Sequence, residues 1–124
     1  MTNLYRSNEI ADLYTIFENA VAESDVDVLL SKFYTPDVIF AGTDLPLSQG
    51  QVVNNVLKGL CGAVESASVE QLQTLVVEPG KVMIDFAIIH AQGKDGTAIK
   101  DRSTCVFQNG PHGWRCVADI FIRD

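Results

Sequence analysis

Three polar residues in the second half of the chain have side chains suited to proton transfer or substrate anchoring: His90, Arg102 and Asp119. A histidine titrates near neutral pH and can act as a general base. An aspartate oriented by an arginine can act as a base or hold a substrate. Each also has a simpler interpretation: His90 as a surface residue or a hydrogen-bonded core residue near a loop, and Arg102 with Asp119 as a cross-strand ion pair on the outer face of a sheet or at a dimer interface. For that pair we favour the simpler interpretation, and Asp85 could join the same cluster.

The three cysteines are Cys61, Cys105 and Cys116, and their spacing matches no metal motif. Their number is odd, so they do not form a complete disulfide framework. We expect three free thiols that pack as small apolar groups. The alternative is a cross-strand disulfide between Cys105 and Cys116, which a reducing cytoplasm and strained geometry disfavour. No glycine-rich loop joins a strand to a helix, as a phosphate-binding loop would. The sequence predicts neither a metal site nor a cofactor.

The elements that must position these residues are helices in the first half and strands in the second. Apolar residues at helical spacing, among them Tyr14 and Phe17, predict a first helix. The serine and acids at 24–27 favour the start of a second helix, and Ser48 with Gln51 favours a third. Clusters of turn residues divide the remainder into strands. The predicted helices are 8–23, 26–35 and 48–62, the predicted strands are 38–41, 65–77, 81–92, 97–108 and 113–122, and 42–47 is predicted as a loop.

Three successive hairpins predict an antiparallel meander, and the helices that precede it indicate the α+β class. The strand 81–92 is apolar on both faces, interrupted by Asp85. Helices can cover only one face of such a sheet, so the other face is predicted to contact a second copy of the chain. The alternative is a β-rich run that leaves some aliphatic side chains exposed.

The pairing of the last hairpin decides which residues face the interior. The predicted interior pairs are Phe107 with Trp114, Cys105 with Cys116, and Ser103 with Ala118. Arg102 and Asp119 then pair on the other face. A four-residue loop at 93–96 places Val82, Ile84, Phe86, Ile88 and His90 on the interior face of the preceding strand. A shift of one residue would exchange the faces, because side chains alternate along a strand.

Three stretches carry a resemblance to a known superfamily. Residues 25–38 run from an acid through a helix that ends in phenylalanine to a strand, residues 47–51 place a glycine before a helix, and residues 113–121 run from a tryptophan to an aspartate. In this order they resemble the ketosteroid-isomerase-like, nuclear-transport-factor-2-like superfamily, in its SnoaL-like or uncharacterised branch. The resemblance implies one domain over 1–124. It also implies a cone-shaped sheet, a four-strand meander plus a short first strand, wrapped around three N-terminal helices.

By the same resemblance the cone holds an apolar pocket, and members pair as homodimers through the outer sheet face. The pocket residues that we expect are Tyr14, Phe17, Phe40, Leu57, Phe86, His90, Ser103 and Trp114. The catalytic positions of the steroid isomerases fall on Phe17, Ala41 and Ser103, which supply neither a base nor an oxyanion donor. Steroid isomerase activity is therefore not expected. Two functions stay open: a cofactor-free, isomerase- or cyclase-like enzyme acting on a small hydrophobic molecule, and a non-catalytic dimeric association module.

The net charge of the chain also limits the classes of partner that we expect it to bind. Sixteen acids against nine lysines and arginines give a net charge of -7. Such a chain lacks the basic face that nucleic acids and anionic membranes require. Residues 1–9 are polar and no apolar signal segment follows them. Together with the free thiols, this favours a cytoplasmic protein.

Overall fold

The computed structural model describes residues 4–124, so the first three residues of the polar segment 1–9 lie outside it. The elements are α1 (Asn8–Ala22), α2 (Val26–Val28), the π-helical turn η1 (Leu29–Phe33), β1 (Tyr34–Gly42), β2 (Leu45–Ser48), α3 (Gln51–Ala63), β3 (Val64–Glu78), β4 (Val82–Gly93), β5 (Ala98–Gly110) and β6 (Gly113–Arg123). The strands form one sheet in the order β2-β1-β6-β5-β4-β3. All neighbours are antiparallel except β1 and β6, which are parallel. The α+β class is confirmed, and the sheet is mixed rather than wholly antiparallel.

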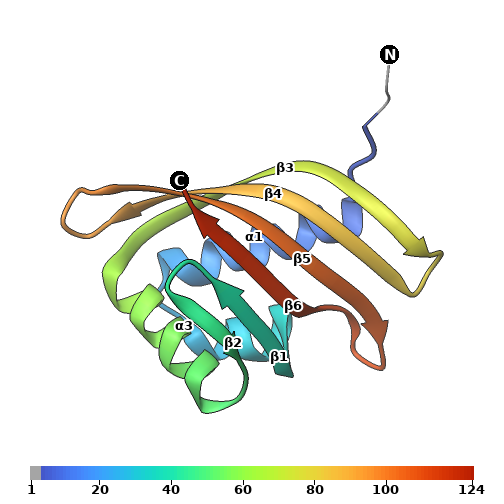
Figure 1. Cartoon of the computed structure of the whole chain (residues 1–124), viewed down its shortest axis with the longest axis horizontal. Coiled ribbons are helices and arrows are strands. Elements are labelled where there is room, and N and C mark those ends of the chain that lie inside the picture. The colour runs from blue at the N-terminus through green and yellow to red at the C-terminus, as the bar shows by residue number, and fades with distance from the viewer. Residues whose placement is uncertain (1–3) are drawn as a thin grey trace.

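The helices lie against the concave side of the sheet, where β3, β4 and β5 curve over α1 (Figure 1). The Ser7 hydroxyl caps α1 by accepting from the Ile10 amide, and Glu9 lies in the first turn, where the helix dipole favours an acid. Asp25 caps the second helical segment in place of the predicted Ser24, which has a φ of 54°. Within residues 4–124, no helix is both long enough and apolar enough to span a membrane.

The segment predicted as the loop 42–47 instead turns into a strand. A turn at Thr43 and Asp44 joins β1 to β2, and Asp44 has a φ of 61°, which aspartate tolerates better than most residues. Ser48 ends β2, and its hydroxyl donates to the Pro46 carbonyl, so it does not cap α3 as predicted. Gly50 occupies the cap position, with a φ of 65°. A Cβ at Gly42 would lie 2.5 Å from the Phe121 ring, so β1 and β6 pack closely because this residue is glycine.

The predicted faces of β4 are wrong. Ala87 pairs with Ser103, and Gln92 pairs with Ala98 across a loop of five residues rather than four. This single extra residue reverses the inward and outward sets along β4. The side chains buried on the inner face are Met83, Asp85 and Ala87, whereas Phe86 is 39% exposed and His90 is exposed.

The predicted pairing of β5 with β6 is wrong for two reasons. Gly110 pairs with Gly113, so the hairpin loop has two residues rather than four, which shifts the pairing by two and leaves the faces unchanged. The second reason does change the faces. Val106 pairs with Ala118 but Phe107 pairs with Cys116, so Val117 is an extra residue, a β-bulge. Beyond the bulge Cys105 faces Asp119, and Arg102 faces Ile122. Asp119 therefore lies on the inner face of the sheet, not on the outer face beside Arg102.

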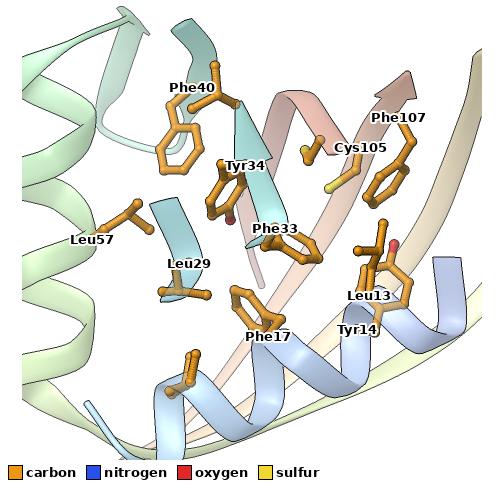
Figure 2. Close-up of a cluster of buried hydrophobic side chains, with 14 of the residues drawn as sticks. Leu13, Tyr14, Phe17, Leu29, Phe33, Tyr34, Phe40, Leu57, Cys105 and Phe107 are labelled. Carbon is orange, nitrogen blue, oxygen red and sulfur yellow. The ribbon is translucent and has the colours of Figure 1, made fainter. Parts of the chain in front are cut away.

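Aromatic side chains form the centre of the core between α1, η1 and the sheet (Figure 2). Phe33 is in contact with four other rings, and its centroid lies 5.3 Å from that of Phe17 and 5.9 Å from that of Phe107. Tyr14 packs edge-on against Phe107. In Figure 2, Leu57 points from α3 toward the strand side chains. The core thus surrounds the region between the helices and β6, where the candidate site lies.

Candidate functional site

A cavity of about 270 Å³ lies between α1, η1, α3 and the inner face of β1, β4, β5 and β6. Most of its lining is apolar or aromatic, which suits a small organic molecule with a large apolar part. The lining residues are Tyr14, Phe17, Phe33, Tyr34, Phe40, Val56, Leu57, Leu60, Ile89, Asp101, Ser103, Cys105, Asp119, Phe121 and Arg123.

The cavity includes some of the residues expected to line a pocket and excludes others. Those in its wall are Tyr14, Phe17, Phe40, Leu57 and Ser103. Phe86 and His90 lie on the outer face because the longer β4–β5 loop reverses the faces of β4. Trp114 packs half-buried against the core but does not line the cavity. His90 Nε2 lies 3.0 Å from Glu70 Oε1 in an exposed surface pair.

Two carboxylates, Asp101 and Asp119, line the cavity, and Asp119 is the buried one. Asp119 is 8% exposed, and its carboxylate accepts hydrogen bonds from Tyr34 Oη at 3.0 Å and from Ser103 Oγ at 3.1 Å. Burial raises the pKa of Asp119 above its ordinary value, although the hydrogen bonds from Tyr34 and Ser103 oppose this shift. A carboxyl group whose pKa lies closer to neutral can both accept and return a proton.

The groups around Asp119 stay protonated and therefore remain available as donors. Burial raises the pKa of the Tyr34 hydroxyl, and the nearby Asp119 charge adds to the shift. The pKa of the Cys105 thiol is raised first by its hydrogen bond with Cys116 and then by burial. Cys105 Sγ lies 3.4 Å from Ser103 Oγ, beside the carboxylate. Asp119 is thus surrounded by neutral O–H and S–H groups, with no lysine or arginine partner among its hydrogen bonds in residues 4–124.

A second buried carboxylate, Asp85, lies behind the cavity wall. It is 0% exposed and accepts from Tyr14 Oη at 2.6 Å, Thr74 Oγ1 at 2.5 Å and Gln71 Nε2 at 3.0 Å. Asp85 does not line the cavity, but Tyr14 connects the two, since its ring forms part of the cavity wall. Asp85 was a possible member of a cluster with Arg102 and Asp119, and of these two only Asp119 shares the inner face with it.

The mouth of the cavity carries an ion pair that the sequence analysis missed. The more exposed lining residues belong to α3 and to the ends of β5 and β6, where Arg123 Nε lies 2.5 Å from Asp101 Oδ1. This hydrogen bond raises the pKa of Arg123 further. The predicted candidate Arg102 lies on the opposite face and pairs with Asp124 at 3.0 Å. Arg123 lies four positions after Asp119, so the two side chains share a face of β6. This shared face was the one sequence signal for Arg123, and it was of use only with the correct face for Asp119.

The three cysteines are free and buried, as expected for thiols that pack in the core. In the described part of the chain, no group of three histidine, cysteine or acidic side chains could hold a metal ion. The polar groups of the site, Asp119 and its hydroxyl neighbours, can form hydrogen bonds and transfer protons.

No protein-family model matches the sequence, and no curated protein matches it significantly. Solved structures are similar over almost the whole chain. A nuclear-transport-factor-2-like protein from Cytophaga hutchinsonii has a TM-score of 0.73 at 13% identity, covering 98% of this chain and 100% of the other. A ketosteroid-isomerase-like protein from Erwinia carotovora atroseptica has a TM-score of 0.74 at 14% identity, covering 95% and 98%. A domain of unknown function with a cystatin-like fold from Nostoc punctiforme has a TM-score of 0.76 at 11% identity, covering 94% and 75%.

These similarities show the fold. The chain has the cystatin-like cone fold of nuclear-transport-factor-2-like and ketosteroid-isomerase-like proteins, so the resemblance stated from the sequence is confirmed at the level of fold. A fold of this kind supports several functions, and the function must be argued from the site.

Proposed function

We propose that this protein binds a small, mainly apolar molecule in the cavity and that Asp119 exchanges a proton with it. One observation carries the proposal: a carboxylate in the wall of an apolar cavity, nearly buried, with two hydroxyl donors and a raised pKa. A purely structural carboxylate has no need to line a cavity. Proton transfer of this kind underlies isomerisation and ring closure next to a carbonyl, and the residues at hand can perform it without a cofactor.

The expected division of roles follows from the contacts. Asp119 accepts the proton, and the hydrogen bonds from Ser103 and Tyr34 hold its two oxygens in place. Each carboxylate oxygen has a further lone pair, so the group can still contact a ligand. A bound ligand that fills the space between the aromatic and aliphatic walls displaces water, which strengthens the electrostatic interaction between the carboxylate and its substrate.

The volume limits the size of the ligand. A water molecule occupies roughly 30 Å³ of liquid, so a cavity of about 270 Å³ corresponds to about nine waters. A compound with one or two rings, on the order of ten to fifteen non-hydrogen atoms, fits such a space. A substrate with an enolisable carbonyl or an acidic hydroxyl would present its polar group to Asp119.

The direct test is deuterium incorporation. One- and two-ring ketones are incubated in D₂O with the protein, and exchange next to the carbonyl is followed by NMR. We expect catalysed exchange with at least one such ketone and a loss of roughly 10²-fold or more in Asp119→Asn. Asp12→Asn, at an exposed position on α1, is the matched control and should retain the activity. Equal exchange by wild type and Asp119→Asn would overturn the catalytic role.

A second function, dimerisation, is supported by the outer sheet face, and we propose a homodimer through it. Phe86 is 39% exposed, Ile120 is 48% exposed and Ile122 is 49% exposed. Together with Leu72 and Ile88 they line a groove on this face. A contiguous exposed apolar patch of this kind is typical of an interaction surface. If the cavity binds nothing, this face alone would support an association module.

Sedimentation equilibrium at micromolar concentration tests the dimer. We expect a dimer for wild type and a monomer for the double variant Phe86→Asp, Ile120→Asp. Leu47→Asp, at an exposed site on β2 that is outside the groove, is the control and should stay dimeric. A monomeric wild type of 13.5 kDa would rule the dimer out.

A further inference from the structure

Three residue pairs on the inner faces of β5 and β6 lead from the mouth of the cavity to its interior. Asp101 pairs with Arg123, Ser103 with Phe121, and Cys105 with Asp119, and all six residues line the cavity. The Asp101–Arg123 pair lies at the exposed end of this series and Asp119 at the buried end. The proposed reactive carboxylate and the arginine therefore lie at opposite ends of one cavity.

The guanidinium of Arg123 is held in place on one edge only. Its Nε donates to Asp101 Oδ1, and its Nη2 lies 3.5 Å from Asp101 Oδ2. Within residues 4–124, Nη1 has no hydrogen-bond partner. Asp101 thus orients the group while the remaining N–H donors are left for another acceptor. The planar fork of a guanidinium matches the geometry of a carboxylate.

We propose that Arg123, oriented by Asp101, binds a carboxylate group of the ligand, so that the substrate is a small apolar acid. The inference rests on the proposed function and adds the class of substrate. A singly charged carboxylate fits better than a phosphate, because Asp101 already offsets part of the positive charge and the chain carries a net charge of -7. The Arg123 side chain is 54% exposed, so binding at this site does not require complete desolvation of either charge.

The spacing along β6 sets the length of this acid. Arg123 lies four positions after Asp119, which corresponds to about 13 Å between their Cα atoms at the usual rise of a strand. Phe121 lies between them on the same face and supplies an apolar contact. The ligand therefore has its carboxylate at one end, its reactive carbonyl or hydroxyl at the other, and an apolar ring system between them.

Two compounds of the same shape separate the charge from the apolar body. 6-Hydroxy-2-naphthoate carries the carboxylate, and 6-hydroxy-2-naphthamide replaces it with a neutral amide. Binding of each is measured by isothermal titration calorimetry at low ionic strength. We expect wild type to bind the acid about tenfold more tightly than the amide, since hydrogen bonds to charged groups contribute at this level. The preference should decrease as salt is added, because the contact is exposed.

Arg123→Gln should remove the preference for the acid and leave the affinity for the amide unchanged. Arg102→Gln is the matched control: it removes the same charge from a neighbouring ion pair on the opposite face and should keep the preference. Arg123→Lys keeps the positive charge but not the planar guanidinium, so it should retain only part of the preference for the acid. A melting curve for each variant verifies that it is folded.

The outcomes separate the inference from the function on which it rests. If wild type binds acid and amide equally, or if Arg123→Gln keeps the preference, the carboxylate site is wrong and the cavity remains a binding site. If neither compound binds, the proposed binding function fails for ligands of this size, and the inference fails with it.

Discussion

Asp85 and Asp119 are both buried carboxylates on the inner face of one sheet, and their surroundings differ. Asp85 is 0% exposed, accepts from three side chains and does not line the cavity. Asp119 is 8% exposed, accepts from two hydroxyl groups and lines the cavity. A fully satisfied carboxylate behind the wall stabilises the fold, whereas one in the wall can still act on a ligand. Burial alone does not distinguish the two roles, but access to the cavity does.

The largest effect is expected from Asp85→Ala. Removing this carboxylate leaves the buried hydroxyl groups of Tyr14 and Thr74 without their acceptor, whereas Gln71 Nε2 still donates to Ser7 O. We expect a loss of about 3 to 5 kcal/mol in the free energy of unfolding, measured by urea denaturation. Asp119→Ala should cost less than half as much, because the freed donors face the cavity, where water can replace the carboxylate. Equal losses for the two variants would contradict the proposed difference between the two sites.

Tyr34→Phe is expected to have a smaller effect, on Asp119 itself. The change removes one of the hydrogen bonds that favour the charged form of Asp119, so the pKa of Asp119 should rise further. The pH profile of deuterium exchange should shift to higher pH, and stability should fall by about 1 kcal/mol. Tyr14→Phe, which removes the donor to Asp85, should leave the position of the profile unchanged. If the pH profile shifted equally in Tyr34→Phe and Tyr14→Phe, Asp119 and Asp85 would not have the separate roles that we propose.

The smallest effect concerns the pH dependence of stability. The pKa of Asp119 is higher in the folded protein than in the unfolded chain, so between these two values the folded state binds more protons. The contribution of Asp119 to stability is therefore greatest below the unfolded pKa, and it falls as pH rises through the interval up to the folded pKa. Asp119→Asn should lack this decline. Urea denaturation at several pH values between 3 and 8 would show the two stability curves separating as pH rises, and curves that stay parallel would contradict it.

Most of the elements could be predicted from the sequence because their signals are local. The apolar stripe of α1, with Tyr14 and Phe17 buried, follows from spacing alone. The positions of the turns near 79–80 and 111–112 follow from glycine, proline and asparagine, and the four long strands begin and end within two residues of their predicted bounds. The strand β2 was missed because its four residues include a proline and lie beside an aspartate in a left-handed turn, which resembles a loop.

The candidate site could be predicted only in part. Helical residues such as Phe17 and Leu57 were placed in the pocket because a helix has one buried stripe, whose position the sequence shows directly. Strand residues such as Phe86 and His90 were placed on the wrong face. Their orientation depends on whether the loop between β4 and β5 has four or five residues. No pattern in the sequence distinguishes these two lengths.

The sequence by itself determined the fold class, the order of helices and hairpins, and the net charge of -7. Periodicity and turn residues act over a few neighbours, and the net charge is a sum over the chain. Only the tertiary structure decided which side chains meet in the cavity. Side chains alternate with a period of two along a strand, so the extra residue at Val117 moved Asp119 from the outer face to the inner face and brought Arg123 to the mouth. The position of this bulge depends on the simultaneous pairing of β6 with β5 and β1, and no local pattern of residues predicts it.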